Sequence, residues 1–91
     1  MREAAIERRL KRKVEAVGGK ALKFSSPGWA GAPDRLVLLP GGRLVFVELK
    51  APGKKPRPIQ LKRHEELKAL GFEVVVIDSL EGVEEFIRRW T

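Results

Sequence analysis

The sequence predicts an α/β fold in which helices pack on one mixed four-stranded β-sheet. Residues 43–50 are rich in β-branched and aromatic side chains and follow a Pro-Gly-Gly turn, which predicts a β-hairpin. Three segments, 2–17, 59–70 and 80–90, carry apolar residues at helical spacing. An apolar run at 72–77 follows the second of them, which predicts a β-α-β crossover beside the hairpin. At 91 residues, the chain is expected to form a single domain over 1–91.

The first predicted helix, 2–17, has one apolar stripe and one basic face. Ile6, Leu10, Val14 and Val17 recur every three or four residues, and Gly18-Gly19 ends the helix. The opposite face carries four cations, Arg8, Arg9, Arg12 and Lys13. This face is typical either of a surface that lies along phosphates or of a solvated helix face.

Strands and loops follow in a regular order. Residues 20–24 and 34–39 are expected to be strands, separated by a loop over 25–33 that is dense in Gly, Pro and Ser. Residues 40–42 form the hairpin turn, and 51–58 form a stiff basic loop with three prolines. In the loop at 25–33, Trp29 is expected either to wedge against bases or to anchor the loop to the core.

The second half is predicted as a helix (59–70), a strand (72–77) and a last helix (80–90). Gly71 closes the first of these helices, and Ser79 is a suitable N-cap for the last. The near-continuous apolar run at 72–77 is typical of a strand covered on both faces. Phe86 and Trp90 are expected in the core, and His64 on the surface.

Composition excludes several kinds of chemistry. The chain has no Cys, no Tyr and one His, so thiolate, tyrosine-nucleophile and multi-histidine metal sites are excluded. No apolar run approaches the roughly 20 residues that cross a bilayer, and the first residues do not resemble a secretory signal. A cytoplasmic protein is therefore expected. Nineteen Lys and Arg against twelve Asp and Glu give a net charge of +7, which favours a polyphosphate partner.

Three charged residues are predicted to converge at one end of the hairpin. Alternation along 44–50 places Glu48 and Lys50 on the same face, about 7 Å apart. Taken alone, they could form a plain ion pair at the sheet margin. The turn at 40–42, however, brings Asp34 beside them. Pro33 biases the preceding residue toward an extended conformation and so directs Asp34 into its strand.

Two carboxylates near one point repel each other, and a bound hard cation would neutralise them. An oxygen site without His or Cys suits Mg²⁺ or Mn²⁺. Water, a phosphate oxygen and the main-chain carbonyl of Leu49 would complete its coordination. No small-molecule cofactor is expected.

Three segments together resemble the signature of VRR-Nuc domains, a branch of the PD-(D/E)XK nucleases. They are Gly31-Ala32-Pro33-Asp34-Arg35, Val47-Glu48-Leu49-Lys50-Ala51-Pro52-Gly53, and Gln60. The resemblance covers essentially the whole chain and implies a restriction-endonuclease-like α-β-β-β-α-β core with a C-terminal helix. It further implies that Asp34 and Glu48 ligate the metal, that Lys50 activates water or steadies the phosphate, and that Gln60 faces the site.

The family also resembles archaeal Holliday-junction resolvases, which carry an acidic residue on the first helix. Glu3 and Glu7 are both candidates here. Glu3 falls in the middle of the apolar stripe by helical phase, which favours it as a further metal ligand, and Glu7 lies at its edge. Alternatively, Glu3 is a first-turn acid that complements the helix dipole.

The sequence is therefore expected to encode a metal-dependent, structure-selective DNA endonuclease that cuts four-way junctions or flaps as a homodimer. Five cations would bind phosphates without reading sequence: Arg8, Arg12, Lys54, Lys55 and Arg57. The alternatives are a non-catalytic nucleic-acid-binding module with the same fold and an RNA-directed nuclease. A compact stand-alone nuclease also fits a phage origin, which the sequence does not itself show.

Overall fold

The computed structural model describes residues 2–91. The elements are α1 (Glu3–Ala16), β1 (Lys20–Lys23), β2 (Arg35–Leu39), β3 (Arg43–Leu49), α2 (Pro58–Ala69), β4 (Glu73–Ile77) and α3 (Leu80–Trp90). Each lies within one residue of its predicted bounds, and the predicted α/β class is confirmed. Across the described part of the chain, no helix is both long and apolar enough to cross a membrane.

The strands form one mixed sheet in the order β1-β2-β3-β4. The first three are antiparallel neighbours, and β4 runs parallel to β3. Arg35 pairs with Val47, so the residue before Arg35 lies opposite Glu48. The hairpin register therefore brings Asp34 next to Glu48, as the sequence predicted.

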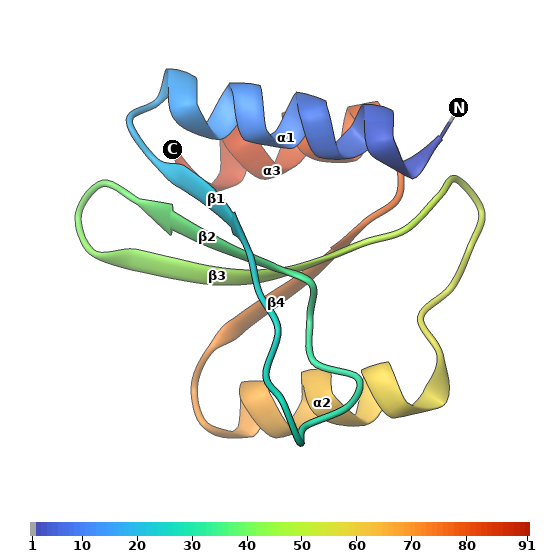
Figure 1. Cartoon of the computed structure of the whole chain (residues 1–91). Helices are drawn as coiled ribbons and strands as arrows, with labels where there is room; N and C mark the ends of the chain where they lie inside the picture. The colour runs from blue at the N-terminus through green and yellow to red at the C-terminus, as the bar shows by residue number, and fades with distance from the viewer. Residues whose placement is uncertain (1) are drawn as a thin grey trace.

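Helices cover the two faces of the sheet unequally. Figure 1 shows α1 and α3 together on one face and α2 on the other. The main core lies under α1 and α3, where Ile6, Leu10 and Val14 pack with Val45, Val47 and Leu49 of β3. On the other face, the Phe46 ring contacts the rings of Phe24 and Phe72 edge-on, with centroids 5.7 Å apart in both pairs. Because strand side chains alternate, Glu48 shares this second face with Phe46.

The prediction that 72–77 is covered on both faces was wrong. β4 is the edge strand beside β3, and Val76 is 42% exposed. Ile77 still belongs to the main core and Val75 packs against it, which accounts for part of the apolar run. Periodicity alone does not distinguish such an edge strand from a central one.

The loop between β1 and β2 is fastened to α2. Arg63 donates from Nε to the Ala30 carbonyl at 2.7 Å, and its guanidinium lies 5.3 Å from the centroid of the Trp29 ring. Gly31 has φ +87°, and a Cβ there would lie 2.9 Å from the Ile59 carbonyl oxygen. Trp29 therefore acts as an anchor for this loop, and the anchored loop delivers Asp34 to the start of β2.

Candidate active site

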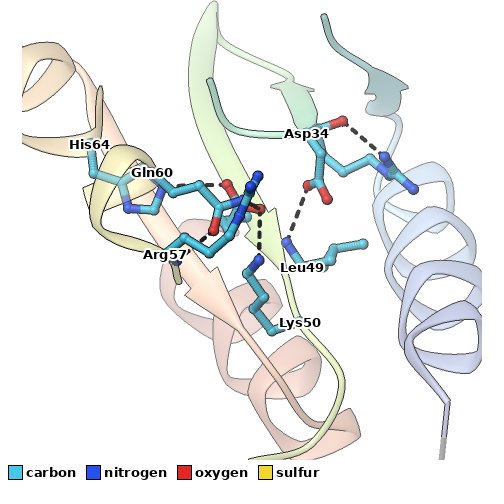
Figure 2. A network of polar contacts seen from close by, with 8 residues as sticks. Asp34, Leu49, Lys50, Arg57, Gln60 and His64 are labelled. Atoms are coloured by element: carbon cyan, nitrogen blue, oxygen red, sulfur yellow. Dashed lines mark hydrogen bonds and ion pairs between the residues drawn. The ribbon is translucent and has the colours of Figure 1, made fainter. Parts of the chain in front are cut away.

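Glu48 is the centre of a polar cluster at the end of β3. The residue is only 1% exposed, and its carboxylate points toward α2. Gln60 Nε2 donates to Oε2 at 3.2 Å, and His64 Nε2 lies 3.4 Å from Oε1. Lys50 Nζ lies 3.8 Å from Oε2. Figure 2 shows Lys50, which directly follows β3, on one side of this cluster and Gln60 and His64 of α2 on the other.

Asp34 lies immediately before β2 and faces the same end of β3. Its Oδ1 accepts a hydrogen bond from the Leu49 amide at 3.2 Å (Figure 2). Burial raises the pKa of Asp34 to about 6, and the negative charges of Glu48 and Glu3 act in the same direction. The Leu49 hydrogen bond opposes this shift without cancelling it.

The pKa of Glu48 is also raised, chiefly by burial. Lys50 lowers it by its positive charge, and Glu3 raises it further. Glu3 thus acts on both Asp34 and Glu48, but burial is the main reason why the ionised form of these two carboxylates is disfavoured.

These residues fit a hard divalent cation. Among residues 2–91, no three Asp, Glu, His or Cys side chains are close enough to enclose a metal ion. Mg²⁺, however, is commonly held by one or two carboxylates, with water and phosphate oxygens completing its octahedron. Asp34 and Glu48 provide two carboxylates whose ionised form is disfavoured chiefly by burial, and a bound cation would offset that cost.

Glu3 and Glu7 have different surroundings, although both lie on α1. Glu7 forms an ion pair with Arg35, whose guanidinium also donates to the Asp34 carbonyl. Glu3 is exposed in the first turn of α1, and its charge raises the pKa of both Asp34 and Glu48. Glu7 therefore joins α1 to β2, whereas the charge of Glu3 acts on the carboxylates of the site.

Gln60 connects the site to the start of α2. Its side-chain Oε1 accepts a hydrogen bond from the Arg57 backbone N–H at 2.8 Å, while its Nε2 donates to Glu48. The amide is thus used at both ends, and its orientation is fixed. Gln60 faces the cluster, as the resemblance implied.

His64 was expected on the surface, and this prediction was wrong. The residue is 3% exposed and lies against Glu48. Burial lowers its pKa, as do the charges of Lys68 and Lys50. The signal was present in the sequence, because a residue four positions after Gln60 lies on the same helix face.

The predicted phosphate-binding cations are all exposed: Arg8 and Arg12 on α1, and Lys54, Lys55 and Arg57 before α2. The other two cations of the α1 basic face have a different role. Arg9 and Lys13 each form an ion pair with Glu84 of α3, at 3.3 Å. They bind α1 to α3, so only part of the predicted basic face is available to a ligand.

Two known proteins resemble the chain over most of its length. No family model matches the chain. The chain is 56% identical over 79 residues to "Putative nuclease p44" of Acyrthosiphon pisum secondary endosymbiont phage 1, covering 87% of this chain and 85% of that protein. A solved structure described as a VRR_NUC domain is 39% identical and superposes with a TM-score of 0.90, covering 98% of this chain and 97% of that one. Because both matches extend over most of each protein, the chain belongs to the VRR-Nuc family of nucleases.

Proposed function

We propose that the protein is a divalent-metal-dependent endonuclease that hydrolyses DNA phosphodiester bonds, with Asp34, Glu48 and Lys50 as its catalytic residues. One observation carries this proposal: two desolvated carboxylates lie beside a lysine at one sheet end. Keeping charged groups out of water costs several kcal/mol per ion unless something compensates. A protein that only binds nucleic acid does not require carboxylates that are kept out of water in this way.

Each residue has a distinct role. Asp34 and Glu48 would hold Mg²⁺ or Mn²⁺, with the Leu49 carbonyl as a further oxygen donor. Glu3, which is not close enough to ligate in this structure, would add to the attraction for a cation by its charge. A bound metal would supply positive charge at the scissile phosphate and lower the pKa of an attacking water. Lys50, half-buried beside Glu48, places a second positive charge where negative charge develops on the phosphate. Gln60 orients the Glu48 carboxylate toward this centre.

Substrate recognition is proposed to depend on shape. The exposed cations Arg8, Arg12, Lys54, Lys55 and Arg57 would bind phosphates and carry no sequence information. The net charge of +7 adds long-range attraction to polyanions. Branched DNA, such as a four-way junction or a flap, offers phosphates in directions that a linear duplex does not.

A two-fold dimer is proposed as the active form on junctions, because symmetric cutting of two strands needs two sites. The edge strand β4 supports this assembly. It carries three consecutive valines with Val76 exposed, whereas the other edge strand, β1, has exposed Lys20 and Lys23, which discourage pairing. Sedimentation at several protein concentrations tests the dimer. A monomer at all of them, active on junctions, would exclude it.

A matched substrate panel tests the function. End-labelled four-way junction, flap, linear duplex, single-stranded DNA and the corresponding RNAs are incubated with Mg²⁺, Mn²⁺ or EDTA. Metal-dependent cutting that favours branched DNA is expected. Preferential cutting of RNA would make the protein an RNA-directed nuclease. Salt-sensitive binding without cutting in any metal would leave a nucleic-acid-binding module and refute the proposal.

A further inference from the structure

Gln60 and His64 hold the two oxygens of Glu48 separately. They lie one helical turn apart on α2 and face the same side. Gln60 donates to Oε2 at 3.2 Å, while the imidazole Nε2 of His64 lies 3.4 Å from Oε1. When Glu48 is ionised, its carboxylate only accepts hydrogen bonds, so Nε2 would then be the donor in this contact.

His64 is well placed for a fixed contact. Both side chains of the pair are almost completely removed from solvent, His64 at 4% and Glu48 at 2%. Water therefore cannot replace a lost donor easily, and a buried carboxylate without its partner costs free energy. At 3.4 Å, the contact is longer than a usual N–H···O hydrogen bond.

The contacts with α2 also keep the Glu48 carboxylate apart from Lys50. Lys50 Nζ is 3.8 Å from Oε2, which is longer than the roughly 2.8 Å of a direct charge-assisted hydrogen bond. If the donor on Oε1 were absent, Gln60 alone would hold the carboxylate on α2, and Oε2 could shift toward Lys50. That closed pair would withdraw both Glu48 and Lys50 from a ligand at the end of the sheet.

We propose that His64 is a positioning residue that fixes Glu48 through Oε1, keeps it apart from Lys50, and thereby presents the carboxylate for metal binding. This inference rests on the proposed function, because it assigns His64 a role in the same site. His64 itself does not touch the substrate. It acts through the orientation of Glu48.

Two variants separate hydrogen bonding from packing. His64→Phe keeps an aromatic ring of similar size and removes the donor, whereas His64→Gln places an amide donor near the position of Nε2. Glu65→Gln, at an exposed position of the same helix, is the matched control. Urea unfolding in EDTA establishes that each variant is folded before other measurements are compared.

The first readout is independent of cleavage. Calorimetric titration of Mn²⁺ into the DNA-free protein is expected to show affinity weakened about 10- to 100-fold in His64→Phe, close to wild type in His64→Gln, and unchanged in the control. The second readout is single-turnover cleavage over a range of Mg²⁺ concentrations. In His64→Phe, the single-turnover rate constant at fixed metal should fall and recover at high Mg²⁺, while the affinity for DNA stays unchanged.

The outcomes distinguish this inference from the proposed function. If wild type binds Mn²⁺ and cuts DNA while folded His64→Phe matches it in both assays, His64 has no positioning role and the inference fails alone. If both variants lose affinity equally, His64 acts by packing and the inference also fails. If wild type neither binds metal nor cuts, the proposed function fails together with it.

Discussion

Replacing Asp34 by asparagine is expected to stabilise the metal-free protein. Burial and the charges of Glu48 and Glu3 disfavour an ionised carboxylate at this position. Asparagine is nearly the same size, carries no charge, and can still accept the Leu49 hydrogen bond through Oδ1. The substitution therefore removes the unfavourable charge and keeps the favourable contact.

The magnitude follows from the pKa of Asp34, which rises from 3.8 to about 6. At about 1.4 kcal/mol per unit, this difference of about 2 units corresponds to an upper bound of about 3 kcal/mol. Asp34 retains some contact with solvent, and screening reduces the figure to about 1–2 kcal/mol. With a urea m-value of about 1 kcal/mol/M for a small domain, the midpoint should rise by about 1–2 M.

The pH dependence has a definite sign. A carboxyl group whose pKa is raised by folding binds its proton more tightly in the folded state. The protonated Asp34 therefore contributes its full stability to the folded protein below pH 3.8. This contribution is lost as the pH rises through about 6. Asp34→Asn and wild type should thus have similar stability near pH 4 and differ fully at pH 8.

The assay is urea unfolding in EDTA at pH 4, 6 and 8, repeated with excess Mg²⁺. Magnesium should stabilise wild type and leave Asp34→Asn nearly unchanged, because the variant has lost a ligand. Asp78→Asn removes the same charge elsewhere and should change stability by less than about 0.5 kcal/mol. A variant that is less stable than wild type at pH 8 in EDTA would refute the reasoning.

Three further predictions concern other parts of the structure. Glu3→Gln should weaken Mn²⁺ binding with little loss of stability. Glu7→Gln should lower the free energy of unfolding in urea by about 2 kcal/mol, because buried Arg35 loses its partner. Equal effects of the two variants on metal binding and on stability would contradict these separate roles. Replacing Lys54 and Lys55 together by alanine should reduce by about 2 the slope of log binding constant against log salt concentration for DNA. An unchanged slope would show that these two lysines do not contact DNA phosphates. Gly31→Ala should destabilise by more than about 1 kcal/mol, since both its φ and the Ile59 backbone oppose a Cβ; unchanged stability would show that the loop adapts.

Element order was predictable because local patterns carry it. Helical spacing, the Pro-Gly-Gly turn and the prolines of 51–58 determine where elements begin and end, and the hairpin register then places Asp34 beside Glu48. The lateral position of a strand depends on tertiary packing instead. For this reason β4 was expected to be covered on both faces, although it lies at the edge.

The parts of the site that the sequence did not predict depend on distant partners. Arg9 and Lys13 are paired with Glu84, which follows more than 70 positions later in the chain, and no local pattern shows this contact. Likewise, the pairing of Glu7 with Arg35 distinguishes it from Glu3 only once α1 lies against β2. His64 was the one residue with a local signal, its spacing from Gln60 on α2.

Single-turnover cleavage of a branched DNA by wild type and Lys50→Ala tests the central claim most directly. Both proteins are first shown to unfold with the same cooperativity, and each is then assayed in Mg²⁺ and in EDTA. Cutting by wild type that requires Mg²⁺ and falls at least about 10²-fold in Lys50→Ala is the expected result. Cutting that persists in EDTA, or that is equal in the two proteins, would contradict a metal-dependent site built on Asp34, Glu48 and Lys50.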